Sequence, residues 1–149
     1  MSLVRLLYVS HLSKDCGPDD LEKILAVSRK NNRASGVTGA LCYSARGFLQ
    51  CLEGPAAVVN ELYRRIARDD RHLDVTLLDY ADIQDRAFGN WSMAYIREDE
   101  IDGDILRRIR GADSFDPFDM AAGEAMDLLK EVVRERTEFL ARQQADAER

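Results

Sequence analysis

The sequence predicts an α+β sandwich of the ferredoxin-like type, with the element order β-α-β-β-α-β, and three observations support this prediction. Residues 4–10 and 47–53 alternate apolar side chains between two faces, as the strands of a sheet do. Residues 18–32 and 55–69 carry apolar side chains at helical spacing. The turn at residues 45–47 is short enough to close a hairpin, so two strands follow one another between the two helices.

The first strand carries a tyrosine at a core position. Val4, Leu6 and Tyr8 share one face of this strand, and Leu7 and Val9 share the other. We therefore expect Tyr8 to point into a core, where its hydroxyl needs a hydrogen-bond partner.

The strand over residues 47–53 holds a second polar side chain in such a position. Gln50 lies between Phe48 and Leu52 on one face. Its carboxamide is therefore also expected to be buried.

The first helix ends in two carboxamides. Gly17 and Pro18 signal its start, and acidic residues follow in its first turn, where they favour the positive end of the helix dipole. Its core-facing stripe is formed by Leu21, Ile24, Leu25 and Ser28. Continuing the stripe by three and four residues leads to Asn31 and Asn32. An unpartnered buried amide costs about 1–3 kcal/mol, so a partner outside the helix is indicated.

Each of these polar residues also has an ordinary structural explanation. Tyr8 could bond a backbone carbonyl, Gln50 could bridge two strands, and Asn31 and Asn32 ahead of Gly36 are typical of a helix end. Their occurrence on three different elements favours a polar ligand between helix and sheet.

The second helix, over residues 55–69, has an apolar stripe formed by Val58, Val59, Leu62 and Ile66. Arg65 and Asp69 extend this stripe with a spacing of four residues. They can form a solvated ion pair worth about 0.3 kcal/mol, or they can meet the polar tail of a ligand.

Two further strands complete the predicted sheet. A fourth is expected over residues 75–82 and a fifth over residues 91–96. In the fifth strand, Trp91 and Met93 are expected to share one face, with Ser92 on the other.

The remaining residues, 98–149, form a helical extension to the domain of residues 1–97. Helices are predicted over residues 101–109 and 120–144. The longer helix has an apolar face formed by Met126, Leu129, Val133 and Leu140. We expect these helices to cover the sheet face formed by Leu7, Val9, Leu49 and Cys51, because an exposed apolar face favours aggregation. The heptad-like spacing also permits self-association.

Composition limits the class of protein. A chain of 149 residues, 46% hydrophobic, is long enough for one full domain. The net charge of −6 argues against nucleic acid or an anionic membrane as a partner. Three cysteines without CxxC spacing indicate neither a disulfide framework nor a metal site, and no apolar run suggests a signal peptide or a membrane span. A cytoplasmic protein is expected.

Several motifs together resemble the BLUF family of blue-light sensors that bind a flavin. Besides Tyr8 and Ser10, they are SRKNN at residues 28–32, GVTGALCY at 36–43, GFLQCLEGP at 47–55, RDDRH at 68–72 and FGNWSM at 88–93. The resemblance extends from about residue 3 to residue 96. The sequence has neither a GxGxxG nor a P-loop motif, so the flavin is implied by the resemblance alone.

The resemblance implies a non-covalently bound flavin between the two helices, usually FAD, with FMN or riboflavin as alternatives. Asn31 and Asn32 would bond the ring, and Gln50 would lie between the ring and Tyr8. Trp91 and Met93 would form a switchable pair in the fifth strand. The remaining implied contacts are Ile24 and Ile66 on the ring faces, Ser28 on the helix stripe, Arg65 and Asp69 at the tail, and Lys30, Arg71 and His72 farther along it.

The function that follows is light sensing rather than enzyme catalysis. Light would drive an electron and a proton from Tyr8 through Gln50, and the signal would pass through the fifth strand and the C-terminal helices. The output would be a downstream signalling protein or a change in a homo-oligomer. A flavin-dependent redox enzyme is the alternative, and an RNA-binding module is a weaker one because the chain is acidic and lacks an aromatic-basic strand motif.

Overall fold

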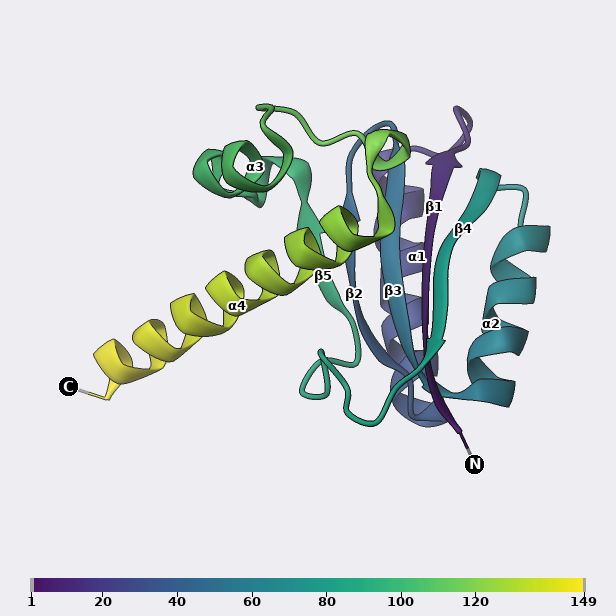
Figure 1. Ribbon diagram of the computed structural model, residues 1–149, viewed down its shortest axis with the longest axis horizontal. Coiled ribbons are helices and arrows are strands. Elements are labelled where there is room, and N and C mark those ends of the chain that lie inside the picture. The colour runs from purple at the N-terminus through teal and green to yellow at the C-terminus, as the bar shows by residue number, and fades with distance from the viewer. Residues whose placement is uncertain (1, 149) are drawn as a thin grey trace.

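A computed structural model describes residues 2–148 and forms one mixed sheet with helices on both faces (Figure 1). The strands are β1 (Leu3–Leu12), β2 (Thr38–Tyr43), β3 (Gly47–Pro55), β4 (His72–Asp82) and β5 (Ala94–Arg97). The helices are α1 (Pro18–Ser35), α2 (Ala56–Arg68), α3 (Gly103–Arg110) and α4 (Ala122–Ala147), with short 3-10 turns η1 (Glu98–Glu100) and η2 (Pro117–Asp119). The strand order is β4-β1-β3-β2-β5. The ferredoxin-like prediction is thereby confirmed.

The alternation predicted for β1 decides what each face of the sheet contains. Leu6 and Tyr8 belong to the core beneath α1 and α2, and Leu7 and Val9 belong to the core on the opposite face. In that second core they pack with residues of the C-terminal helices such as Leu129. The prediction that these helices cover the far face is confirmed.

Helix α1 begins where the sequence indicates and runs three residues beyond its predicted end. Gly17 precedes the first turn, Pro18 is its first residue, and Asp20 bonds back to the Gly17 amide at 3.0 Å. Gly36 ends the helix with φ 74°, a left-handed conformation that glycine adopts without a steric penalty. Asn32 therefore lies one turn before the helix end, with its side chain buried.

The prediction for the fifth strand was wrong in two respects. Strand β5 begins only at Ala94, and the chain bends at Ser92. As a consequence, Met93 packs in the core beneath α1 and α2, whereas Trp91 packs against the core of the far face. The two side chains do not share a face because the segment before Ala94 is not an extended strand.

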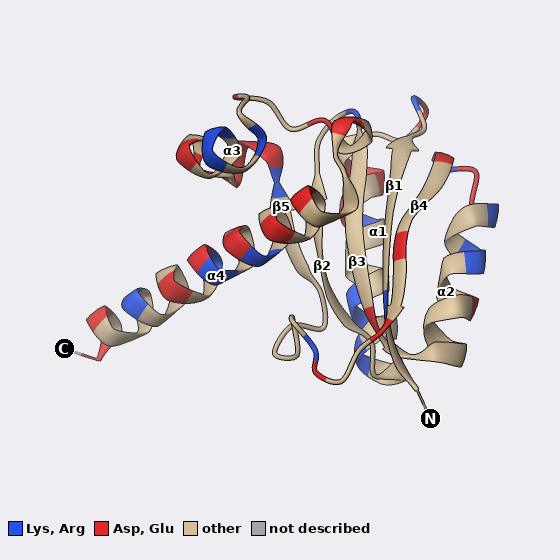
Figure 2. Ribbon diagram, in the orientation of Figure 1, with Lys and Arg blue, Asp and Glu red and all other residues tan. Residues whose placement is uncertain are grey.

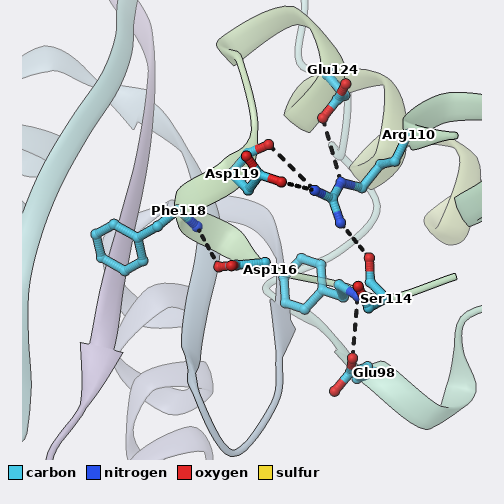
Figure 3. Close-up of polar contacts among 8 residues, drawn as sticks. Glu98, Arg110, Ser114, Asp116, Phe118, Asp119 and Glu124 are labelled. Carbon is cyan, nitrogen blue, oxygen red and sulfur yellow. Dashed lines mark hydrogen bonds and ion pairs between the residues drawn. The ribbon is translucent and has the colours of Figure 1, made fainter. Parts of the chain in front are cut away.

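The loop between α3 and α4 is held by a single buried arginine (Figure 3). The Arg110 side chain is 4% exposed and pairs with Asp119 at 3.1 Å and Glu124 at 3.5 Å. Its guanidinium also donates to the carbonyl of Ser114. Arg110 thus joins the end of α3 to η2 and to the first turn of α4.

The last part of α4 extends away from the sheet (Figure 1). Phe139 and Leu140 are 48% and 44% exposed, so the prediction that Leu140 continues the buried face was wrong. Acidic and basic residues alternate along this helix (Figure 2). None of the helices within residues 2–148 combines the length and apolar character needed to cross a membrane.

Candidate functional site

Tyr8 and Gln50 form a buried hydrogen-bonded pair at the centre of the sheet. They lie directly opposite one another on β1 and β3 and are 0% and 6% exposed. The Tyr8 hydroxyl donates to Oε1 of Gln50. The alternation of the two strands positions this pair, since both side chains point toward α1 and α2.

Burial changes the acidity of the Tyr8 phenol. Burial away from water is the main reason that the pKa of Tyr8 lies well above its ordinary value, and repulsion from the nearby Tyr63 and Tyr95 phenols raises it further. A free tyrosinate is therefore disfavoured at this position. The neutral phenol keeps its proton in the hydrogen bond to Gln50.

The other end of the Gln50 amide contacts the segment before β5. Its Nε2 donates to the Met93 sulfur at 3.5 Å. Gly39 makes this approach possible, because a Cβ atom there would lie 2.0 Å from the Cys51 carbonyl oxygen and 3.1 Å from the Met93 methyl carbon. Gln50 thus connects Tyr8 on β1 to Met93 on the strand-five side.

Above this pair lies a groove of about 590 Å³ between α1 and α2. A smaller cavity of about 50 Å³ beneath it is lined by Tyr8, Gln50 and Asn32. The two cavities share Ile24 and Ile66, one from each helix. The groove therefore leads from the surface to the tyrosine–glutamine pair, and its volume is within the range of small-molecule sites.

The α1 side of the groove supplies the predicted carboxamides. Asn32 is 2% exposed, and its Nδ2 donates to the Ser92 carbonyl at 3.3 Å. Among residues 2–148 no hydrogen bond to its Oδ1 is formed, so this acceptor remains for a ligand. Asn31 is exposed and lies with Ser28 along the groove wall.

The α2 side supplies Ile66, Arg65 and Asp69, but not in the predicted pairing. Arg65 lies 3.5 Å from Glu61, four residues earlier on the same helix. Asp69 instead receives three hydrogen bonds from the Arg71 side chain, which lower the pKa of its carboxyl to about 2. The Arg65–Asp69 ion pair, one of the two alternatives that their spacing permits, is absent because α2 ends at Arg68 and Asp69 lies beyond its last turn.

His72, the first residue of β4, is partly buried beside the groove. It lines both cavities, and its Nδ1 lies 2.9 Å from the Ser10 hydroxyl on β1. Burial lowers the pKa of its imidazole. A neutral ring is therefore favoured at neutral pH.

Most of the predicted contact residues come together around these cavities. They are Ile24, Ser28, Asn31, Asn32, Gln50, Arg65, Ile66, Asp69, Arg71 and His72. Lys30 is exposed on α1 and does not line either cavity, so its contact remains a prediction. Within residues 2–148, no three His, Cys, Asp or Glu side chains are placed to hold a metal ion.

The chemistry of the groove fits a flat ligand with a polar edge. Aliphatic side chains from two helices face the ligand space from opposite sides, and a buried carboxamide with a vacant acceptor lies at its base. Charged side chains such as Arg65, Asp69 and Arg71 also line the groove. This arrangement defines a small-molecule-binding domain with a buried, hydrogen-bonded tyrosine–glutamine pair beneath its groove.

Comparison with known proteins identifies that domain. The profile of the BLUF family, described as sensors of blue light using FAD, matches residues 3–94. The chain belongs to the BLUF family of flavin-binding blue-light sensors. Solved structures agree: it resembles the dark state of BlrB with a TM-score of 0.74 and 30% identity over 89% of this chain and 95% of that one. It resembles the photo-activated state of BlsA with a TM-score of 0.77 and 30% identity, covering 87% and 94% of the two chains.

Curated relatives carry the same region within longer proteins. The blue light- and temperature-regulated antirepressor BluF of Escherichia coli K12 is 37% identical over 93 residues, 61% of this chain and 23% of that protein. The alpha subunit of photoactivated adenylate cyclase of Euglena gracilis is 36% identical over 88 residues, 59% of this chain and 9% of that protein. The chain thus spans about a tenth of the length of the first relatives it matches.

Residues that shape the site were missed from the sequence. Arg29 of α1 donates to the Met93 carbonyl, and the Tyr95 hydroxyl of β5 donates to the Leu25 carbonyl of α1. Glu53 is 0% exposed and accepts hydrogen bonds from the Ala87 and Phe88 amides. A signal existed for Arg29, because it precedes Asn32 by three residues and so shares its helix face. Glu53 gave a weaker signal, as an acid in a strand that is otherwise buried.

Proposed function

We propose that this chain is a blue-light photoreceptor that holds a flavin between α1 and α2 and signals by contact, without chemistry on a diffusible substrate. The observation that carries the proposal is the groove that leads down to the hydrogen-bonded Tyr8 and Gln50. Membership in the BLUF family supports the light-sensing role. FAD is the flavin we expect, and FMN is an alternative because a relative, BlrP1 of Klebsiella pneumoniae, has a structure with FMN.

The groove residues suggest how the flavin would be held. Ile24 and Ile66 would pack on the two ring faces, and Asn32, with Asn31 and Ser28, would bond its polar edge. Arg65 would meet the phosphate-bearing tail. Asp69, Arg71, His72 and Lys30 would lie along that tail.

The hydrogen bonds beneath the groove support a reversible photochemical step. A bound flavin supplies a blue-light-absorbing oxidant. Tyr8 loses an electron most readily when its phenolic proton leaves in the same event, and Gln50 accepts that proton through Oε1. Electron and proton then both return to Tyr8, and the Gln50 amide remains rotated or tautomerised. The new bond is worth about 1 kcal/mol, so a small red shift without net oxidation is expected.

The signal would leave through Met93. A rearranged Gln50 amide no longer presents the same donor to the Met93 sulfur, which lies directly before β5. Strand β5 leads through η1 into α3, and α3 packs on α4. A downstream protein or a change in homo-oligomer would therefore respond to the C-terminal helices.

The test is a light-minus-dark absorption spectrum of the purified chain and two variants. The parent should be yellow, shift slightly to the red under blue light, and recover in darkness. Tyr8→Phe and Gln50→Leu should bind flavin and lose the shift, because each keeps the shape of the side chain and removes the relay. Tyr63→Phe, which retains Tyr8, is the control and should shift as the parent does.

Two results would contradict the proposal. One is a Tyr8→Phe protein that switches with the yield of the parent. The other is bleaching of the bound flavin by NAD(P)H in darkness, which would favour a flavin-dependent redox enzyme.

A further inference from the structure

The segment between β4 and β5 makes several hydrogen bonds to the rest of the protein, and those of its second half bear on Met93. Glu53 accepts hydrogen bonds from the amides of Ala87 and Phe88 at 2.6 and 3.0 Å. Farther along, the Trp91 carbonyl accepts from the Gly39 amide at 3.2 Å. At its end, where the chain bends before β5, the attachments come from side chains of α1.

The attachments at the end of the segment are two donors on one face of α1. Arg29 donates from Nη2 to the Met93 carbonyl at 3.2 Å, and Asn32 donates from Nδ2 to the Ser92 carbonyl at 3.3 Å. These carbonyls precede the first residue of β5 and lie outside its pairing with β2. Hydrogen bonds from α1 therefore help to hold Met93 in position, in addition to the bonds that the sheet makes at Trp91 and from Gln50.

Arg29 is itself fixed by the residue two positions after Met93. Its guanidinium carbon lies 4.6 Å from the centre of the Tyr95 ring, and the Tyr95 hydroxyl donates to the Leu25 carbonyl of α1 at 2.7 Å. Arg29 thus contacts the Tyr95 ring, and Tyr95 in turn bonds the same helix that carries Arg29. These contacts limit how far the end of the segment can move.

The position of Met93 determines which side chain meets Gln50. Met93 contacts Gln50 beneath the groove, whereas Trp91, two residues earlier, packs on the opposite face of the sheet. A shift of the segment along its length would exchange side chains between the faces. We infer that Arg29 is a positioning residue whose hydrogen bond to the Met93 carbonyl keeps the methionine sulfur, and not Trp91, against Gln50.

Arg29 can be tested apart from the ligand. It is exposed and does not line the groove, whereas Asn32 is buried and lines it. A change at Asn32 would alter flavin binding and segment position together. A change at Arg29 acts on the segment while the groove keeps its lining.

The experiment is NMR spectroscopy of the full flavin-bound chain in darkness, with methyl-labelled methionine and nitrogen-15. The chain has four methionines, and the methyl signal that disappears in Met93→Leu belongs to Met93. The chain has one tryptophan, so its single indole signal reports Trp91. The variants are Arg29→Ala, Arg29→Lys and, as the matched control, Arg33→Ala, an exposed arginine one turn later on α1. Backbone amide signals outside residues 88–97 check that each variant folds.

In Arg29→Ala, the Met93 methyl signal of the parent should weaken in favour of a second signal, and the Trp91 indole signal should shift. Removal of one hydrogen bond should change the ratio between the position with Met93 against Gln50 and the position with Trp91 there by about fivefold. Arg29→Lys keeps a cationic donor and should retain the signals of the parent, as should Arg33→Ala. The inference is overturned if Arg29→Ala leaves both signals unchanged, if Arg29→Lys behaves as the alanine variant, or if Arg33→Ala shifts them equally.

The importance of Arg29 for light sensing rests on the proposed function, but the dark-state measurement does not. A parent chain that fails to bind flavin, or that does not shift under blue light, would remove the proposed function. The Met93 and Trp91 signals of the flavin-free chain would still report whether Arg29 holds the segment.

Discussion

On one face of the sheet, α3 and α4 seal a continuous apolar core, whereas on the other face α1 and α2 stand on either side of a groove. Leu128, Leu129 and Ala125 of α4 are fully buried against strands β1, β2 and β3. The groove-facing residues Ile24 and Ile66 remain only partly buried. The same sheet is therefore stabilised from one side and left free to bind a ligand from the other.

The difference arises from the side chains that the helices present. The inner face of α4 is apolar over three turns, so close packing is favourable. The inner face of α1 changes from Leu21 and Leu25 to Ser28 and Asn32. These positions give the groove polar atoms, whose burial requires hydrogen-bond partners such as the Ser92 carbonyl that Asn32 contacts.

The largest expected effect is a loss of stability on the sealed face. Leu128→Ala should lower the free energy of unfolding by about 2–5 kcal/mol, because it leaves a cavity in a close-packed core. Leu62→Ala, on the groove side and only partly buried, is the matched comparison and should cost clearly less. Urea unfolding of the flavin-free proteins measures both, and equal losses would mean that the two faces are packed alike.

The next effect concerns the groove face alone. Asn32→Leu should weaken flavin binding by about 1–3 kcal/mol, because a ligand group loses its buried partner. Asn31→Leu changes an exposed residue of the groove wall and should weaken binding less. Titration of flavin into the apoprotein gives both affinities. Unchanged affinity in Asn32→Leu would reduce this residue to an ordinary helix-end amide.

A smaller effect is expected from pH through His72, which lines the groove. Burial lowers the pKa of His72 in the folded protein, so the unfolded chain takes up its proton first as pH falls. Stability linked to His72 is fully present above about pH 6.5, the ordinary histidine value, and is lost as pH falls through the folded pKa. His72→Gln keeps a polar partner for Ser10 and should reduce the change of the unfolding midpoint between pH 7 and pH 5. A variant with the full pH dependence of the parent would assign that dependence to other groups.

The smallest effect on stability should come from the exposed end of α4. Ending the chain after Thr137 should change the free energy of unfolding by no more than about 0.5 kcal/mol, because residues 139–148 are exposed. The flavin spectrum and its photocycle should be retained, while any light-dependent change in assembly or partner binding is lost. Light scattering after size exclusion, in darkness and under blue light, checks this. Removal of the whole segment from residue 121 is a poorer test, since it would uncover Leu128 and Leu129.

The sequence was sufficient for the residues whose surroundings are set by local geometry. Two-residue alternation placed Tyr8 and Gln50 in one core, and helical spacing placed Asn32 beside them. The opposite positions of Trp91 and Met93 could not be foreseen. The carbonyls at the bend accept hydrogen bonds from α1, about sixty residues earlier in the chain, and such distant contacts cannot be recognised from local alternation.

Ion pairs were also beyond local reasoning. The spacing of Arg65 and Asp69 favours a pair on a helix, but Glu61 and Arg71 compete for these two side chains. Which pair forms depends on where α2 ends. Leu140 has the spacing of a core residue and is exposed because α4 extends beyond the edge of the sheet.

Helix α1 holds the segment before β5 by its backbone carbonyls, which has a consequence for protein engineering. Arg29 and Asn32 bond the main chain of residues 92 and 93, so replacing the side chain at position 93 leaves both bonds in place. The Met93 side chain that contacts Gln50 can therefore be replaced by leucine, serine or glutamine without removing these two hydrogen bonds. Such a series would adjust the lifetime of the signalling state while the framework that positions it stays constant.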